Sequence, residues 1–324
     1  MTPPFQVAMV LAAGRGERMQ PLSSVLPKPA LTLPNGPVIA SSMNLAARAG
    51  VDRIVVNSWH LAEKMTAVVA EIAIDGVEVV LSPETELMGT GGGLALARDR
   101  GLLGQDGPVL VLNGDSVVGL DLDALVERHL EAEDSVTLAL LPHLDPGRWS
   151  RVVLDADGRV AGIHAPGRPK TSEAPFLYPG VMAVSRAALD SIPVAPGEIP
   201  EVLWEPAREK HRLGGVVVAG HWREVGTPAD YLAVMNLRLA GATVVHPTAT
   251  VDTSASLAAS FVGRNVTIED GVEIEASIVD EGAVIRSGAR VKNSVLMGGV
   301  EVQRDETVTD EVRAYPCHEG RQTS

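Results

Sequence analysis

The chain has 324 residues, 45% of them apolar, a length that suggests two domains rather than one core. Its net charge of −14 disfavours nonspecific binding to nucleic acid or to anionic membranes, so we expect neither as a partner. A single cysteine, Cys317, excludes an internal disulfide and fits a reducing cytoplasm. With no basic leader and no apolar run long enough for a membrane span, we expect a cytoplasmic protein.

Residues 5 to about 240 alternate between strand-like and helix-like segments. The strand-like runs are FQVAMVLAA, DRIVVNS, GVEVVLSP and PVLVLNGD, and the helix-like segments between and after them are PVIASSMNLAARAG, GGGLALARDR and DLDALVERHLEAE. We expect Pro37 in the first turn of the first helix, Gly50 after its end, and Asp121 as the cap of the third. The alternation predicts an α/β fold with a Rossmann-like, mostly parallel sheet covered by helices on both faces.

Two later segments complete this first region. RVVLDADGRVAGI predicts a hairpin that turns at Asp157 and Gly158, which makes the sheet mixed. PADYLAVMNLRLAG, residues 228–241, predicts a closing helix. We therefore place a catalytic domain at residues 1–241.

After Gly241 the pattern changes to a repeat of 17 residues. Apolar residues fall at spacings of six, six and five, and serines recur with the same period; the members are Val245, Val251, Leu257, Val262, Ile268, Ile274, Val279, Ile285, Val291, Leu296, Val302 and Val308, with Ser260, Ser277 and Ser294. Three short strands in each period predict a triangular β-solenoid of about four coils at residues 242–312. A polar tail follows at 313–324.

The first strand leads into LAAGRGERMQPL, which does not fit a dinucleotide-binding turn because Met19 stands where that fingerprint needs its third glycine. Glycines at the carboxyl end of a strand let backbone N–H groups approach phosphates, and Arg18 is able to bridge two phosphate oxygens. Lys28 follows between two prolines that fix its direction. The residues predict a triphosphate cradle, with a solvated surface loop as the alternative.

The stretch LAAGRGERMQPLSSVLPKPAL, residues 11–31, resembles the signature of sugar-1-phosphate nucleotidyltransferases, with Ser23 in place of a threonine. The resemblance extends to the solenoid, because mannose-1-phosphate guanylyltransferases and related enzymes carry a C-terminal left-handed β-helix. It implies a nucleotide site that includes Leu11, Ala13, Gly14 and Gly16.

Other motifs carry further residues of this family over. VLNGDSVV implies that Asp115 holds Mg²⁺, and LMGTGGGLA implies that Gly89 and Thr90 pack against the base. FLYPGVMAVS and PGEIPEVLW imply sugar contacts by Gly180 and by Glu198, with Glu201 as its rival. Acidic residues before the glycine loop, Glu84 and Glu86, are suited to accept hydrogen bonds from guanine, which favours GTP over UTP.

The segment GHWREVGTPADYL departs from the family at one position and implies two more site residues. Glu224 replaces the aspartate that gives the second metal ligand, and we interpret it as a working Mg²⁺ ligand, with an impaired metal site as the alternative. Thr227 is expected at the sugar phosphate. The family's Glu-Lys-Pro triplet is absent, and Lys170 or Arg168 is the candidate replacement.

Together these features predict an Mg²⁺-dependent enzyme that joins a nucleoside triphosphate to a sugar 1-phosphate and releases pyrophosphate. Arg18, Lys28 and Asp115 are the expected catalytic residues, and GTP with mannose 1-phosphate is the preferred substrate pair. UTP or dTTP with glucose 1-phosphate or N-acetylmuramate 1-phosphate, and a non-catalytic regulatory relative, remain alternatives. We expect the solenoid to mediate homo-oligomers rather than acyl transfer.

Overall fold

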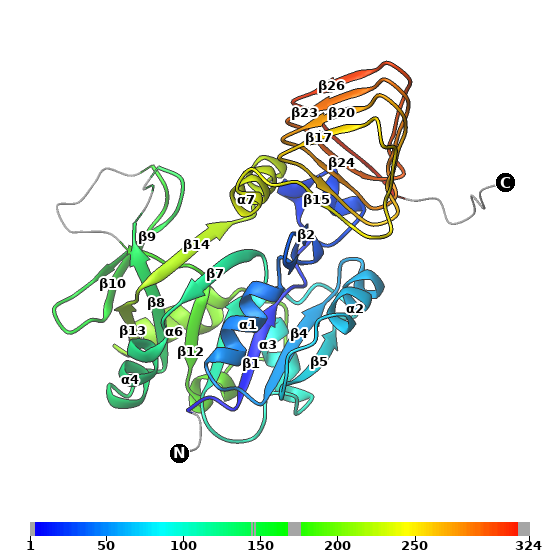
Figure 1. Cartoon of the computed structure of the whole chain (residues 1–324). Helices are drawn as coiled ribbons and strands as arrows, with labels where there is room; N and C mark the ends of the chain where they lie inside the picture. Colours follow the sequence, from blue (N-terminus) through cyan, green and yellow to red (C-terminus); the bar gives the residue numbers. More distant parts are fainter. Residues whose placement is uncertain (1–3, 144, 146, 168–175, 317–324) are drawn as a thin grey trace. The chain divides into compact units, whose positions relative to one another are not determined.

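The computed structural model describes residues 4–143, 145, 147–167 and 176–316 (Figure 1). Two compact units make up the chain: the first comprises Met1–Gly14 and Ile39–Arg223, and the second Arg15–Val38 and Glu224–Ser324. The closing helix and most of the signature segment thus belong with the solenoid, whereas the sequence placed a boundary after residue 241. Each unit is described in turn.

The first unit is built on a ten-stranded mixed sheet in the order β10-β9-β11-β8-β12-β6-β1-β4-β5, with β13 paired to β8. Its strands are β1 (Val7–Leu11), β4 (Arg53–Ser58), β5 (Glu78–Pro83), β6 (Val109–Asn113), β8 (Val136–Pro142), β9 (Arg151–Leu154), β10 (Val160–His164), β11 (Phe176–Leu177), β12 (Val181–Val184) and β13 (Leu213–Val217). Strands β5, β4, β1 and β6 run parallel, and β12 is antiparallel to both β6 and β8. The predicted α/β class is confirmed.

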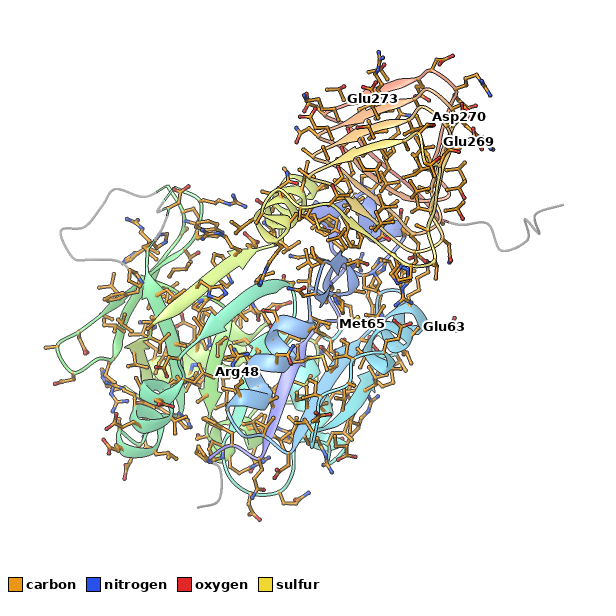
Figure 2. All side chains as sticks on the ribbon, in the orientation of Figure 1. Arg48, Glu63, Met65, Glu269, Asp270 and Glu273 are labelled. Carbon is orange, nitrogen blue, oxygen red and sulfur yellow. The ribbon has the colours of Figure 1, made fainter. Side chains whose placement is uncertain are left out.

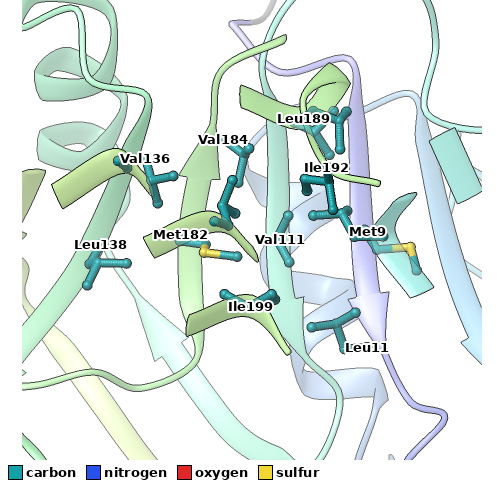
Figure 3. Packing of buried hydrophobic residues seen from close by; sticks show 14 of the residues in the cluster. Met9, Leu11, Val111, Val136, Leu138, Met182, Val184, Leu189, Ile192 and Ile199 are labelled. Atoms are coloured by element: carbon teal, nitrogen blue, oxygen red, sulfur yellow. The ribbon is translucent and has the colours of Figure 1, made fainter. Parts of the chain in front are cut away.

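Helices and a small second sheet complete this unit. They are α1 (Ala40–Arg48), α2 (Ala62–Ala70), α3 (Gly89–Asp99), α4 (Asp123–Glu131), α5 (Arg186–Asp190), the π-helical turn η4 (Pro200–Trp204), α6 (Glu205–Glu209), and the pair β7 (Ser116–Leu120) and β14 (Gly220–Glu224). Figure 3 shows the core, where Met9, Val111 and Met182 of neighbouring strands pack with Ile192 and Ile199 of the segments that cover them. Among the described residues no helix has the length and apolarity to cross a bilayer.

Two of the predicted helix starts differ from the structure. Pro37 lies in β3 (Gly36–Pro37), paired with β2 (Thr32–Leu33), so α1 begins only at Ala40. The cap position of α4 is Leu122, although the Asp121 carboxylate still accepts a 3.1 Å hydrogen bond from the Asp123 N–H. In the first case strand pairing sets the start of the helix, and in the second a local turn does. The spacing of apolar residues encodes neither of these.

The other local predictions for this region are confirmed. Gly50 follows α1 with a φ of 83°, and the β9–β10 hairpin turns through Asp157 and Gly158, whose φ is 71°. The closing helix is α7 (Pro228–Leu239).

The second unit contains a parallel β-helix of three sheets, β15-β18-β21-β24-β27, β16-β19-β22-β25 and β17-β20-β23-β26. Its strands are β15 (Val244–Val245), β16 (Thr250–Val251), β17 (Ser256–Ala258), β18 (Phe261–Val262), β19 (Thr267–Ile268), β20 (Glu273–Glu275), β21 (Ile278–Asp280), β22 (Val284–Ile285), β23 (Arg290–Lys292), β24 (Val295–Gly298), β25 (Glu301–Val302), β26 (Thr307–Thr309) and β27 (Val312–Tyr315). Residues 17 apart pair across coils, as Val262 does with Val279. This architecture is consistent with the expected left-handed β-helix.

The interior of the solenoid shows why the sequence repeats every 17 residues. The inward apolar residues from Val262 to Val308 form one buried cluster, whereas Val245 is 41% exposed because no coil precedes it. The buried serines form a ladder in which the Ser277 N–H donates to Ser260 Oγ at 3.1 Å, while each hydroxyl donates to a carbonyl two residues earlier. Strand β27 continues to Tyr315, so the tail predicted from residue 313 starts inside a strand.

The rest of the second unit is the signature segment and α7. The segment forms three short helical turns, η1 (Glu17–Met19), η2 (Leu22–Ser24) and η3 (Lys28–Ala30), followed by β2 and β3.

Candidate functional site

The carboxyl ends of four parallel strands gather polar residues at one edge of the large sheet. Strand β1 leads into residues 11–14, and β4 carries Asn57 next to its last residue. Strand β5 leads to Glu84, and β6 leads to Asp115. Leu11 and Ala13 are buried and Gly14 is exposed. In open α/β sheets this edge is where ligands bind, because the loops that leave it converge.

A buried hydrogen-bond chain links three of these strand ends. The Ala12 N–H donates to Asn57 Oδ1 at 2.7 Å, and Asn57 Nδ2 donates to Glu84 Oε1 at 2.7 Å. Glu84 Oε2 accepts from the Met88 N–H at 3.0 Å. A Cβ on Gly93 would lie 2.6 Å from Glu84 Oε1 and 2.8 Å from Asn57 Nδ2, so only glycine leaves room for this chain. Glu84 therefore braces the start of the signature loop, a contact that the sequence did not reveal.

The environment of Glu84 also affects its ionisation. Only 7% of the residue is exposed, and burial raises the pKa of its carboxyl, while the hydrogen bonds from Met88 and Asn57 and the charge of Arg100 act in the opposite direction. Sequence reasoning missed Asn57 altogether. The available signal was a lone amide at the end of the apolar strand RIVVNS.

Two predicted subsites meet at the start of α3. Glu198 Oε2 accepts from the Thr90 hydroxyl at 2.6 Å and from the Thr90 N–H at 3.2 Å, and the Ile199 N–H donates to Thr90 Oγ1 at 2.9 Å. Gly89 has a φ of 71°, and a Cβ there would lie 2.7 Å from the Gly197 carbonyl oxygen. The predicted base loop and the predicted acidic segment for the sugar are therefore in direct contact. The Glu201 N–H donates to the Glu198 carbonyl at 3.0 Å.

Asp115 lies in the turn between β6 and β7, close to Gly180, the residue that precedes β12. The Asn113 N–H donates to the Gly180 carbonyl at 2.8 Å, and the Gly114 N–H donates to the Leu11 carbonyl at 2.9 Å. Ser116 Oγ lies 3.3 Å from Asp115 Oδ1. These contacts fix the turn against β1 and β12, so Asp115 and Gly180 lie at the same edge of the sheet.

In the second unit, Arg18 and Glu224 form an ion pair across 206 residues of sequence. Arg18 Nη2 lies 2.8 Å from Glu224 Oε1; the arginine side chain is 67% exposed and the glutamate 14%. A Cβ on Gly226 would lie 2.8 Å from the same Glu224 oxygen, so the carboxylate folds back over that glycine. An exposed guanidinium held beside a carboxylate is placed to meet an anionic ligand.

Lys28 packs closely against the glycine turn of the signature segment. Gly16 has a φ of 65°, and a Cβ on it would lie 3.1 Å from Ser23 Cβ and 3.5 Å from Lys28 Cβ. Lys28 is 8% exposed. The turn therefore depends on glycine both for its backbone conformation and for space.

Thr227 and the remaining candidates have less direct support. The Thr227 hydroxyl lies 2.8 Å from Asp230 Oδ2 and accepts from the Asp230 N–H, which makes a capping box for α7 and leaves its role at a sugar phosphate a prediction. Lys170 and Arg168 lie outside the described residues. Within the described part of the chain, no group of three or more His, Cys, Asp or Glu side chains lies together.

Comparisons with known proteins assign the family. The nucleotidyl transferase model matches residues 7–240, and the GlmU-like C-terminal hexapeptide model matches residues 240–318. The chain therefore belongs to the nucleotidyl transferase family and carries a hexapeptide β-helix, which confirms the family predicted from the signature segment. Enzymes of this family typically use a divalent metal.

Two similar proteins are named as mannose-1-phosphate guanylyltransferases. The chain is 29% identical over 238 residues to the probable mannose-1-phosphate guanylyltransferase 2 of Arabidopsis thaliana, covering 72% of this chain and 65% of that protein. It is 28% identical over 265 residues to the mannose-1-phosphate guanylyltransferase catalytic subunit beta of Drosophila pseudoobscura pseudoobscura, covering 75% and 70%. HddC of Yersinia pseudotuberculosis shares the fold, with a TM-score of 0.61 at 21% identity over 72% of this chain and 99% of HddC.

Proposed function

We propose that this protein transfers a nucleotidyl group from a nucleoside triphosphate to a sugar 1-phosphate, with GTP and mannose 1-phosphate as the preferred pair. The observation that carries the proposal is the Arg18–Glu224 pair, because two separate sequence motifs imply triphosphate binding for Arg18 and metal binding for Glu224, and the two side chains lie 2.8 Å apart. The names of the relatives support the choice of guanine and mannose.

In the proposed reaction an oxygen of the sugar 1-phosphate attacks the α-phosphorus of the triphosphate. The new P–O bond forms as the bond to the β-phosphate oxygen breaks, and pyrophosphate leaves with its electron pair. The attacking phosphate is already an anion, so no general base is needed. Catalysis then consists of alignment and charge neutralisation.

The proposed roles follow from the chemistry of each side chain. Arg18 neutralises the leaving pyrophosphate, and Lys28 contacts the α-phosphate or the sugar phosphate. The backbone of Gly14 and Gly16 approaches the triphosphate, and Gly89, Thr90 and Glu84 shape the base site. Gly180, Glu198 and Thr227 contact the sugar side, with Lys170 proposed for its phosphate. These assignments rest on the sequence motifs.

The metal proposal concerns Asp115 and Glu224. Both offer hard carboxylate oxygens, the ligand type that Mg²⁺ prefers, and Glu224 is only partly exposed. When bound, Mg²⁺ would supply positive charge that draws the two phosphate groups together. We therefore propose Mg²⁺ as the cofactor.

The proposal is tested by pyrophosphate release from the full-length protein with Mg²⁺. Five nucleoside triphosphates are combined with a panel of hexose 1-phosphates, and the fastest release is expected with GTP and mannose 1-phosphate. Faster release with UTP or dTTP would transfer the assignment to a uridylyl- or thymidylyltransferase. No release from any pair would contradict the enzymatic proposal.

One observation favours a second candidate, a regulatory relative that binds nucleotide without turnover. Glu224 replaces the usual aspartate, and one of its oxygens is engaged by Arg18. This candidate predicts micromolar binding of a nucleotide sugar in calorimetry together with no pyrophosphate release.

Homo-oligomers through the β-helix remain a prediction, and light scattering at micromolar concentration checks it.

A further inference from the structure

Two sheets of the β-helix present very different outer faces. Strands β18, β21 and β24 are buried at every residue, whereas β20, β23 and β26 bury only their central residue. The outward side chains of the first sheet are Phe261, Ile278, Asp280, Val295 and Met297, and those of the second are Glu273, Glu275, Arg290, Lys292, Thr307 and Thr309. Figure 2 shows Glu273 pointing away from the solenoid. A solenoid requires only inward residues to be apolar, so the first sheet is a contact surface.

The contacts of that surface lead to the signature segment. Strand β27 touches η2, and a Cβ on Gly298 would lie 3.3 Å from Val25 Cγ2. The Asp280 carboxylate accepts hydrogen bonds from the Thr32 hydroxyl, from the Arg264 N–H and, at 2.8 Å, from the Glu281 N–H. The last strand and the third-coil residue Asp280 thus hold both ends of the segment from Leu22 to Thr32.

Thr32 is held from a second side by the helix that follows Glu224. The hydroxyl of Tyr231, a fully buried residue of α7, donates to the Thr32 carbonyl at 2.6 Å. Upstream, the Leu31 N–H donates to the Lys28 carbonyl at 3.3 Å. A continuous path of contacts therefore joins Asp280 to Lys28 through Thr32.

We propose that the β-helix positions the signature segment for the nucleotidyl transfer, and that Asp280 is a positioning residue that acts through Thr32 on Lys28. The inference rests on the proposed function, since positioning matters only if the segment binds substrate. It assigns to the solenoid a role inside the protomer, beyond assembly.

The repeat itself does not require an aspartate at this position. The equivalent residue is Gly263 in the preceding coil and Met297 in the following one. Burial raises the pKa of the Asp280 carboxyl, so its ionised form is unfavourable in the folded state and lowers stability as pH rises through that pKa. A buried carboxyl that the repeat does not require, and that accepts a hydrogen bond from the Thr32 hydroxyl, points to a role in holding Thr32.

The test compares three substitutions in the full-length chain. Asp280→Ala removes both carboxylate oxygens, whereas asparagine would keep Oδ1 as an acceptor for Thr32; Thr32→Val removes the hydroxyl, and Thr32→Ser retains it. We expect Asp280→Ala and Thr32→Val each to lower kcat about tenfold while KM changes less than about threefold. The double variant should be no slower than either single one, and Thr32→Ser should resemble the wild type.

Hydrogen exchange provides a readout that does not depend on activity. Amides at residues 19–31 donate within the segment, as Val25 does to Leu22, and their exchange should accelerate about tenfold in Asp280→Ala. The control is Glu275→Gln on the exposed sheet, where an ion pair with Lys292 is lost and neither readout should change.

The outcomes separate this inference from the proposed function. Unchanged exchange in Asp280→Ala would overturn the positioning role whatever the activity. Faster exchange with an unchanged kcat would overturn it as well, because the segment would then move without effect on the reaction. An inactive wild type would contradict the proposed function, and the exchange data would still decide whether Asp280 orders the segment.

Discussion

Buried polar groups have different roles at the carboxyl edge and at the amino edge of the large sheet. At the carboxyl edge, Asn57 and Glu84 accept hydrogen bonds from the Ala12 and Met88 N–H groups, in the loops that lead to Gly14 and Gly89. At the amino edge, Asp134 is fully enclosed and pairs with Arg128 and Arg159, while Thr137 donates to the same carboxylate at 3.0 Å. The first arrangement holds loops ready for a ligand, and the second closes a network on itself. We expect changes at the first edge to affect activity and changes at the second to affect stability.

The largest stability effect is expected at Asp134. In Asp134→Asn two guanidinium groups lose their shared counter-charge, which should lower the free energy of unfolding by about 3 kcal/mol, since both arginines retain some contact with solvent. Urea denaturation at pH 7 measures this loss, and kcat per folded molecule should stay unchanged. The control Asp123→Asn removes an exposed carboxylate in α4. A loss of less than about 1 kcal/mol in the free energy of unfolding would contradict the expected difference between the two edges of the sheet.

His129 should make the amino edge sensitive to acid. Its Nδ1 lies 2.8 Å from Thr137 Oγ1, and burial lowers its pKa to about 4. Because the folded-state pKa lies below the unfolded value, the stabilisation is complete above about pH 6.5 and is lost as pH falls through about 4. The contribution is about 3 kcal/mol, and His129→Gln should remove that part of the pH dependence in urea titrations at pH 7 and pH 4. An equal acid sensitivity in the variant would contradict it.

The smallest of these effects is expected at the carboxyl edge, from Glu84→Gln. The amide of glutamine must face one of two donors, Asn57 Nδ2 or the Met88 N–H, so one hydrogen bond is lost. We expect kcat/KM for nucleotide to fall about tenfold, with Tm nearly unchanged. Glu78→Gln, which breaks an exposed pair with Arg53, serves as the control and should leave both values unchanged. A drop in Tm without a change in kcat/KM would assign Glu84 to the stability class.

The sequence patterns predicted the structural features that repeat along the chain or that depend on residues close together in it. The 17-residue period of the solenoid was sufficient to predict its inward residues, because each coil imposes the same requirement on the next. The alternation of segments likewise predicted the mixed α/β sheet. Pro37 and Leu122 show the limit of such patterns, since strand pairing and local turns set the helix starts there.

The sequence patterns did not predict contacts between residues that are far apart in the chain. The link from Asn57 to Glu84 and the link from Thr32 to Asp280 join segments with no shared motif. The role of Glu84 at the base stays a prediction, and the sequence did not indicate that its two oxygens accept hydrogen bonds from Asn57 and from the Met88 N–H. Long-range side-chain partners depend on how strands and coils stack, and a one-dimensional pattern carries little of that information.

The central claim is that the carboxyl edge carries out nucleotidyl transfer, and Asp115→Asn tests it most directly. Pyrophosphate release is measured with the best substrate pair at saturating Mg²⁺, beside Asp99→Asn as an exposed control in α3. We predict that Asp115→Asn lowers kcat/KM at least about a hundredfold with an unchanged Tm, because a proposed carboxylate ligand to Mg²⁺ is lost. Activity within about threefold of the wild type would contradict the account.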